Sequence, residues 1–362
     1  MAFDVDPPAS GRGLVDPSLA AAAWGVQRQA SLALLDDVRT SAEDAGMAGG
    51  RLLVHAREWA WTKAPMEPRI PRSLAHWRSV PGGREWLRRL PEIVDECADA
   101  WDLELGEPYN GGKVGLALRA RRADGSPAVL KISFPGLEAA NEAAALAHWR
   151  GTGAVRLLER DDERHALLLE RCEPGGQLSG VADEDEALAA AAYVLRQIWR
   201  SPPEPHAFAL LEDEAARWAE QLPSRWREHG RPFERALVDA AVAACRDLGS
   251  DREDAVVCHQ DFHGGNVLRA TRERWLAIDP KPVVGERAFD TAWLLRDRRA
   301  SVGASAHPEP RLRRRLDLLS GELGLDRERM RGWGIARAVE WALHGRRVQH
   351  GHIEFAKVLQ AV

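Results

Sequence analysis

Strand-like and helix-like patterns occupy separate parts of this 362-residue chain, and that separation limits its possible folds more than any other feature. Short apolar runs separated by a polar turn, Lys113 to Arg121 and Ala128 to Ser133, predict a β-hairpin. An Ala-rich helical segment follows at Leu137 to Arg150. After the breaker Glu173-Pro-Gly-Gly most apolar positions recur at helical spacing, apart from two short apolar runs near residues 256 and 276. The sequence therefore predicts an α+β fold in which a small, mostly β lobe precedes a larger, mostly helical lobe.

The same patterns predict where the chain divides. Residues 1–70 mix Pro, Gly, Ala and charged residues without a sustained period, which predicts a partly ordered N-terminal extension. Residues 71–172 form the predicted N-lobe, which begins with an amphipathic helix near Glu85 and includes two later strands, Val155 to Glu159 and Ala166 to Glu170. Residues 173–362 form the predicted helical C-lobe.

Composition narrows the class of protein. A hydrophobic content of 45% can build real cores, and the longest apolar runs are too short to cross a membrane. Aspartates in the first 25 residues oppose a secretory signal, so we expect a cytoplasmic protein. The four cysteines have no metal-site spacing. With a net charge of −5, the basic run Arg311 to Arg315 is interpreted as a solvated helix face, and no nucleic-acid partner is expected.

The segment His259-Gln-Asp-Phe-His-Gly-Gly-Asn-Val-Leu carries the strongest chemical signal. Phosphoryl transfer to a hydroxyl requires a carboxylate that orients the nucleophile and oxygen ligands that hold Mg²⁺. Asp261 supplies the first, and Asn266 and Asp279, which follows an apolar run, supply the second. An Asp and an Asn five residues apart, with a second Asp after a short strand, are typical of kinases. The alternative is a Gly-containing turn in which Asp and Asn merely cap backbone amides.

Upstream residues favour the phosphoryl-transfer interpretation. Lys131 lies in the apolar strand Val129 to Ile132, and Glu142 lies on the following helix. A strand lysine paired with a helix glutamate positions the α- and β-phosphates of a nucleotide. Glu138, at the start of the same helix, is a competing partner for the lysine.

A glycine-containing loop precedes this strand. Gly111 and Gly112, within Asn110-Gly-Gly-Lys-Val-Gly115, lie where a loop covering phosphates belongs, and glycine lets backbone amides approach a nucleotide. The loop has neither the GxGxxG register nor a Walker ending, and a plain hairpin turn explains it equally well.

Together these motifs resemble the aminoglycoside phosphotransferase family, and more narrowly its branch of streptomycin 6-phosphotransferases and hydroxyurea phosphotransferases. The resemblance covers residues 70–350 approximately, and residues 1–70 do not align with it. Its most specific feature is the Asp279-Pro-Lys-Pro form. The segments that carry the resemblance are His259 to Leu268, Ile278 to Pro282, Ala128 to Pro135, Asn141 to Leu146, Ala154 to Leu158 and Leu167 to Arg171.

The resemblance implies a protein-kinase-like two-lobed fold, with ATP and Mg²⁺ as cofactors. It implies that Asp261 is the catalytic base, that Asn266 and Asp279 bind magnesium, and that Lys131 and Glu142 position the phosphates. It further implies that the backbone of Glu170, Arg171 and Cys172 meets the adenine, and that His259 and Asp290 brace the catalytic loop. The irregular glycine loop leaves the choice between ATP and GTP open.

The resemblance also indicates the acceptor, an aminoglycoside antibiotic of the streptomycin type. A cationic acceptor predicts an acidic pocket, and the acidic runs Asp183 to Glu186 and Glu212 to Glu214 are candidates for its lining. Trp293 and Trp341, in the C-terminal region, are candidates for its wall. The alternatives are hydroxyurea, another small metabolite with a hydroxyl, or a catalytically silent binding protein that keeps the kinase fold. Neither the hydroxyl that is modified nor the oligomeric state follows from the sequence.

Overall fold

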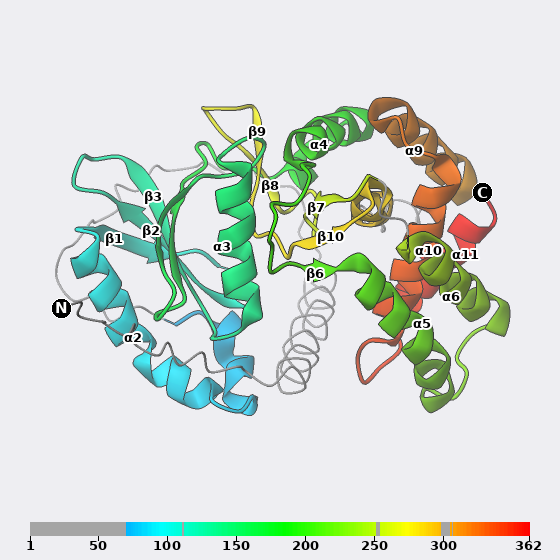
Figure 1. The fold of residues 1–362 in the computed structure, drawn as a ribbon, viewed down its shortest axis with the longest axis horizontal. Helices are drawn as coiled ribbons and strands as arrows, with labels where there is room; N and C mark the ends of the chain where they lie inside the picture. Colours follow the sequence, from blue (N-terminus) through cyan, green and yellow to red (C-terminus); the bar gives the residue numbers. More distant parts are fainter. Residues whose placement is uncertain (1–69, 111, 251–253, 298–304, 306) are drawn as a thin grey trace, which may run out of the picture.

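The computed structural model describes residues 70–110, 112–250, 254–297, 305 and 307–362, without the side chains of residues 137–139. Figure 1 shows a small lobe built on one sheet and a larger lobe of helices, with short strands between them. This is the α+β arrangement predicted from the sequence. The predicted extension, except for Ile70, lies outside the described residues.

An antiparallel five-stranded sheet with the order β1-β2-β3-β5-β4 forms the small lobe. The sequence predicted four of the strands but missed β1. Helix α2 (Gly83–Ala100) packs on one face and helix α3 (Leu137–Trp149) lies on the other (Figure 1). The strands are β1 (Glu104–Pro108), β2 (Gly115–Arg121), β3 (Pro127–Ser133), β4 (Leu157–Asp161) and β5 (Ala166–Glu170), and a short 3₁₀ helix, η1 (Arg72–Ser79), precedes α2.

Alternation along β3 places a lysine between the sheet and α3. Leu130 and Ile132 are fully buried in the core that α2 shares with the sheet. Because successive side chains of a strand point to opposite faces, Lys131 faces α3. The strand pattern thus determines which helix can supply the partner of this lysine.

Helices dominate the larger lobe, and their apolar faces form one core that also includes α3 and part of β5. Helix α10 lies at the centre, in contact with α5, α6, α7, α9 and α11. The helices are α4 (Glu184–Ile198), α5 (Leu211–Glu228), α6 (Arg235–Gly249), α7 (Thr291–Arg296), α9 (Pro308–Leu323), α10 (Arg327–Leu343) and α11 (His350–Gln360), with 3₁₀ turns η2 (Leu178–Gly180) and η3 (Arg287–Asp290).

Two small sheets lie between the five-stranded sheet and these helices (Figure 1). One has the order β6-β10-β7, and the other is the antiparallel pair β8-β9. The sequence predicted short apolar runs only near β7 and β9. The strands are β6 (Ala209–Leu210), β7 (Val256–Cys258), β8 (Val267–Arg269), β9 (Trp275–Ala277) and β10 (Val283–Gly285).

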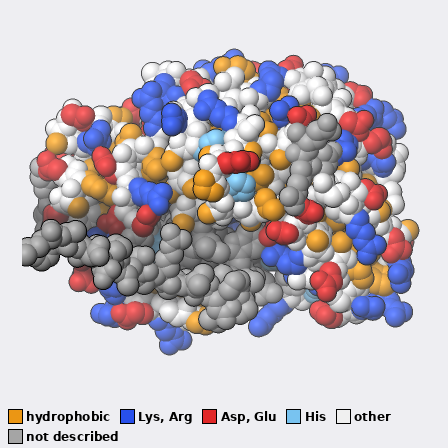
Figure 2. Space-filling model, viewed as in Figure 1, with side chains coloured by type: hydrophobic (Ala, Val, Ile, Leu, Met, Phe, Trp, Pro, Cys, Tyr) orange, Lys and Arg blue, Asp and Glu red, His pale blue; other side chains and the backbone are white. Residues whose placement is uncertain are grey.

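Three remaining features concern the surface charge, the length of the helices and the cysteines. Acidic and basic side chains are intermixed on the face shown in Figure 2. No helix within the described part of the chain is long and apolar enough to span a membrane. The cysteines Cys97, Cys172, Cys245 and Cys258 are all free thiols.

Candidate active site

Strand pairing brings the three predicted catalytic and metal-binding residues to one place. Asp261 and Asn266 lie on the loop from β7 to β8, and Asp279 follows β9. In the β8-β9 pair the amide of Ile278 donates to the carbonyl of Asn266 at 2.9 Å, so the metal-ligand candidates leave the pair at the same end. Asn266 Nδ2 donates to the carbonyl of Asp261 at 3.0 Å and closes the catalytic loop.

Asp290 fixes the start of this loop from η3. Its carboxylate accepts hydrogen bonds from the amides of His259 at 2.9 Å and Gln260 at 2.7 Å, and from Trp199 Nε1 at 3.0 Å. Gln260 has a φ of 65°, a left-handed conformation that non-glycine residues rarely adopt. The Asp290 side chain makes no helix-cap bond, so its role is to brace the loop, as the resemblance implied.

Burial acts on both titratable groups that brace the loop. It raises the pKa of Asp290 to about 6, although Trp199 and the two amides favour the carboxylate. It lowers the pKa of His259 to about 4. The His259 ring stacks on Trp149 and its Nε2 donates to the carbonyl of Ile278 at 3.0 Å, so a neutral imidazole joins the loop to β9.

Lys131 joins the two lobes through carboxylates. Its Nζ lies 2.7 Å from both carboxylate oxygens of Glu142 and 2.6 Å from Asp279 Oδ1. Burial alone would lower the pKa of Lys131, but the carboxylates of Asp279 and Glu142 raise it above its ordinary value. The structure therefore brings together the predicted pair, whereas the side chain of the competing candidate Glu138 lies outside the described residues.

The donor set around Asp279 suits Mg²⁺. With Asn266 Nδ2 committed to a carbonyl, the amide oxygen of this residue can face a cation, beside the Asp279 carboxylate. Mg²⁺ prefers oxygen ligands and usually takes one or two carboxylates, completing its shell with water and substrate phosphates. Within the described ranges no three His, Cys, Asp or Glu side chains cluster as a metal site, which is compatible with a cation shared with a nucleotide.

Lys281 is a site residue whose role the sequence analysis missed. Its Nζ donates to Asp261 Oδ2 at 2.6 Å, and its amide donates to the carbonyl of His259 at 3.0 Å. Burial would raise the pKa of Asp261, but Lys281 and then His263 hold it well below its ordinary value. His263 Nε2 lies 3.9 Å from Asp261 Oδ1. The only sequence signal was the lysine of Asp279-Pro-Lys-Pro, two residues after a metal-ligand candidate.

The predicted nucleotide contacts lie at the edges of the small lobe. Gly112 is exposed on the loop between β1 and β2, and Gly111 lies outside the described residues. Glu170 ends β5, and its amide donates to the carbonyl of Arg156 at 2.9 Å. Arg171 and Cys172 follow it in the connection to the helical lobe.

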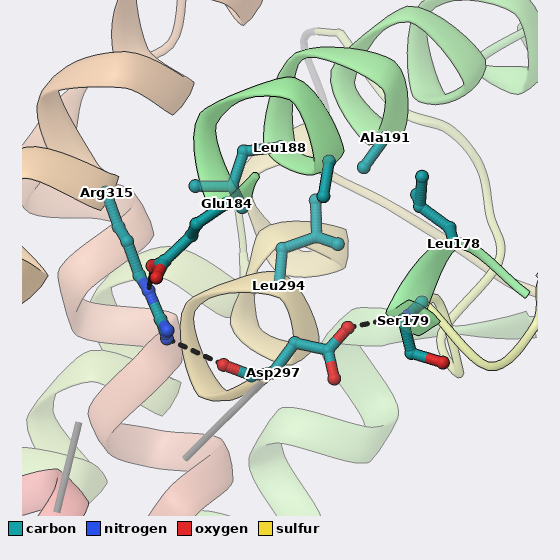
Figure 3. Close-up of a pocket in the computed structure, with 10 residues that line it drawn as sticks. Leu178, Ser179, Glu184, Leu188, Ala191, Leu294, Asp297 and Arg315 are labelled. Carbon is teal, nitrogen blue, oxygen red and sulfur yellow. Dashed lines mark hydrogen bonds and ion pairs between the residues drawn. The ribbon is translucent and has the colours of Figure 1, made fainter. Parts of the chain in front are cut away.

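A small cavity behind the catalytic loop is too small for a substrate. Its volume is about 20 Å³, close to that of one water molecule. Figure 3 shows Asp297 between Ser179 and Arg315. The Asp297 carboxylate accepts from the amide of Gly264 at 2.7 Å, while its carbonyl accepts from Arg315 Nη1 at 2.7 Å. Asp297, which lines this cavity, therefore connects the catalytic loop to Arg315 of α9. It is a second point at which the helical lobe holds the loop.

The acidic runs proposed as pocket lining are largely neutralised by arginines. Glu184 pairs with Arg311 and Arg315, and Asp185 pairs with Arg314, so α4 and α9 are joined by ion pairs. The basic run is therefore packed against an acidic helix rather than merely solvated. The other pairs of these runs are Glu186 with Arg274 and Glu214 with Arg217.

Aromatic rings lie beside the catalytic loop instead. The ring of His263 lies 5.2 Å from that of Trp293, which lies 4.3 Å from that of Trp341. The Arg296 guanidinium lies 3.9 Å from the Trp293 ring centroid. Sequence reasoning named both tryptophans as candidate walls of an acceptor pocket but did not identify Arg296.

Known proteins are similar to this chain in sequence and in fold. A family model described as aminoglycoside/hydroxyurea antibiotic resistance kinase matches residues 103–349. Streptomycin 6-kinase of Streptomyces griseus is 36% identical over 274 residues, which are 75% of this chain and 89% of that protein. Hydroxyurea phosphotransferase of Kitasatospora aureofaciens is 36% identical over 317 residues, or 85% of this chain and 89% of that protein.

Solved structures support the fold. Choline kinase LicA from Streptococcus pneumoniae has a TM-score of 0.51 and 15% identity, over 76% of this chain and 100% of that chain. At this identity the likeness concerns the fold alone, and it confirms the predicted two-lobed, kinase-like class.

Proposed function

Because the chain belongs to the aminoglycoside/hydroxyurea antibiotic resistance kinase family, as its motifs predicted, we propose that it transfers the γ-phosphoryl group of ATP to a hydroxyl of a small molecule. The observation that carries the proposal is the meeting of Lys131 from the sheet with Asp279 at 2.6 Å, beside the loop that holds Asp261 and Asn266. A lysine, an amide and two carboxylates from three separate segments suit a nucleotide, a metal ion and a hydroxyl nucleophile.

Each residue has a role that its position supports. Asp261 orients the acceptor hydroxyl and accepts its proton, and Lys131, held by Glu142, binds the α- and β-phosphates. Asn266 and Asp279 hold magnesium, which neutralises charge on the phosphates when it is bound. Catalysis then depends mainly on positioning and electrostatics.

We extend the proposal to the arrangement of the chain. The N-lobe, residues 71–172, binds the nucleotide through the loop at Gly111 and Gly112, and the C-lobe, residues 173–362, carries the catalytic loop and the acceptor. The adenine contacts the backbone of residues 170–172, chiefly through Arg171 and Cys172, because the amide of Glu170 is already bonded to Arg156. We also propose that the enzyme acts in the cytoplasm, where ATP is supplied.

For the acceptor we propose a cationic aminoglycoside of the streptomycin type, from the 36% identity to a streptomycin 6-kinase. Hydroxyurea is a second candidate because the phosphotransferase for hydroxyurea has the same identity over a longer part of this chain, 85%. The two acceptors differ greatly in size, and we do not expect one pocket to suit both. An enzyme assay with each acceptor in turn can therefore distinguish the two candidates.

The test measures magnesium-dependent ADP release from ATP in the presence of streptomycin, other aminoglycosides or hydroxyurea. We expect one acceptor to stimulate release, and we expect Asp261→Asn to reduce kcat by about 10²- to 10⁴-fold, the usual contribution of a general base. Lys357→Met, which changes a partly exposed lysine on α11, is the control and should retain wild-type turnover. Absence of stimulation by every acceptor, with intact ATP binding, would refute the proposed acceptors.

A further inference from the structure

We propose that Lys281 is a catalytic residue of this enzyme, which releases Asp261 when the substrates bind and contacts the γ-phosphoryl group during its transfer. The inference rests on the proposed phosphotransferase function and adds a residue to it. The main observation is the 2.6 Å hydrogen bond from Lys281 Nζ to Asp261 Oδ2, which places the ammonium group in direct contact with the candidate base.

The backbone presents Lys281 in a constrained way. Proline precedes and follows it, and each proline fixes its own φ and lacks an amide donor. The amide of Lys281 itself is bonded to the carbonyl of His259 at 3.0 Å, at the start of the catalytic loop. The base of this side chain is therefore held, while its four-carbon stem can redirect the ammonium over a few ångströms.

The position of the ammonium coincides with the place where the transferred group must pass. During transfer the phosphoryl group lies between the acceptor hydroxyl, which the base orients, and the leaving oxygen of ADP. Lys281 Nζ contacts Asp261, and Lys281 lies only two residues after Asp279 in the chain. The ammonium thus lies against the candidate base, on the segment that also carries a candidate metal ligand.

Lys131 cannot serve the same purpose from its position. Its ammonium is already shared between Glu142 and Asp279, and only 14% of its side chain is exposed. The Lys281 side chain is 28% exposed, so an incoming substrate can reach it. The two lysines therefore divide the phosphates between them, with Lys131 toward the α- and β-phosphates and Lys281 toward the γ-phosphate.

In the transfer step the acceptor O–H bond breaks and its proton moves to Asp261. The acceptor oxygen forms a bond to the γ-phosphorus, and the bond from that phosphorus to its bridging oxygen breaks, so the electron pair leaves with ADP. Lys281 is unchanged by the step. Its charge stabilises the equatorial oxygens of the phosphoryl group, as fixed cations do in other phosphoryl transfers.

The experiment compares Lys281→Met with Lys131→Met, which is the same substitution at the other lysine. Isothermal titration calorimetry gives the Kd of ADP and of the non-hydrolysable analogue AMP-PNP, each with Mg²⁺, and turnover assays give kcat and KM. For Lys281→Met we expect the AMP-PNP Kd to rise by about tenfold or more while that of ADP stays within about twofold, since only the former reports a contact to the γ-phosphate. For Lys131→Met we expect both to rise.

Turnover supplies the second readout. We expect Lys281→Met to reduce kcat by about 10²-fold with little change in the acceptor KM, because the lost contact is made to the transferred group. Lys281→Arg should recover part of this loss, since it retains the charge with another geometry. An unchanged kcat, or equal weakening of ADP and AMP-PNP by Lys281→Met, would overturn the proposal and leave Lys281 as a structural partner of Asp261.

Two further measures keep these outcomes decisive. If Lys281→Met does not fold, the double variant Asp261→Asn with Lys281→Met removes both charges and is used for the same nucleotide titrations against Asp261→Asn alone. If the wild-type protein phosphorylates none of the acceptors, the proposed acceptors are wrong, whereas the comparison of AMP-PNP with ADP still decides whether Lys281 contacts the γ-phosphate.

Discussion

Replacement of Asp290 should loosen the catalytic loop without touching any residue that meets substrate. Only 1% of this residue is exposed, and its carboxylate is the acceptor for three N–H donors from two parts of the chain. Asp290→Ala removes all three bonds and leaves buried donors without this partner. Asp290→Asn is the matched variant, because it keeps the volume and one carbonyl oxygen.

The bond pattern ranks the two variants. Asp290 Oδ2 accepts from the His259 amide and from Trp199 Nε1, and Oδ1 accepts from the Gln260 amide. An asparagine with its oxygen at the Oδ2 position keeps two bonds and loses one, which costs about 1–2 kcal/mol of unfolding free energy. Alanine loses three, which costs about 3–6 kcal/mol by the same measure.

The effect of Asp290→Asn should also depend on pH. The pKa of Asp290 in the folded protein, about 6, lies above its ordinary value of 3.8. A raised pKa means that folding favours the protonated form, so this stabilising contribution is fully present below pH 3.8 and is lost as the pH rises through 6. Asparagine cannot take up that proton, and its deficit in stability should therefore be greater by about 2 kcal/mol at pH 4 than at pH 7.

Urea unfolding followed by tryptophan fluorescence, at pH 4 and at pH 7, measures these differences. The difference between the variant and the wild type isolates Asp290, because all other titrating groups are common to both. In parallel, kcat at pH 7 should fall in the order wild type, asparagine, alanine. An alanine variant as stable as the wild type, or an asparagine deficit that shrinks at pH 4, would refute the role assigned to this carboxylate.

Three further changes test other contacts. Lys131→Met leaves the buried carboxylate of Glu142 and the partly exposed carboxylate of Asp279 without their shared ammonium. We expect a loss of about 3 kcal/mol in urea unfolding, which acid should reduce by protonating them. Arg272→Ala frees the Glu170 carboxylate, to which it donates at 2.8 and 2.9 Å; because the pair is partly exposed, we expect only about 1 kcal/mol in the same assay. Gly153→Ala should lower the Tm by several degrees, since Gly153 has a φ of 68° and a new Cβ would lie 2.6 Å from Gln197 Cβ.

The sequence predicted those parts of the fold in which an element and its packing partner are neighbours in the chain and each has a clear apolar pattern. The β2-β3 hairpin and α3 follow one another along the chain, and their apolar spacing was sufficient to place them. β1 was missed because Glu104–Pro108 contains glycine and proline, and its register with β2 shifts between Leu105 and Pro108. Its strand character comes from pairing with β2 and not from its own composition.

The same distinction applies to the site. Lys131 in β3 and Glu142 in the next element, α3, are only 11 residues apart, so their pairing could be inferred from spacing. The bond from Lys281 to Asp261 spans 20 residues, and it depends on how β8, β9 and β10 return the chain to the loop that follows β7. No periodicity in the sequence encodes that return, since each of these strands has only three residues.

The acceptor pocket shows why a charge run in a sequence does not establish a charged site. In the sequence, residues Asp183 to Glu186 form an acidic run. Arg311, 127 residues after Glu184, begins a basic run that ends at Arg315. In the fold α4 and α9 lie together, so the two runs largely cancel, and Arg315 is buried with only 2% of its surface exposed. The electrostatic potential at Asp261 therefore depends on groups that were not conspicuous in the sequence, chiefly Lys281 and His263. An acceptor should be inferred from such neighbours of the base, because Coulomb interactions between exposed groups beyond about 10 Å are largely screened by salt.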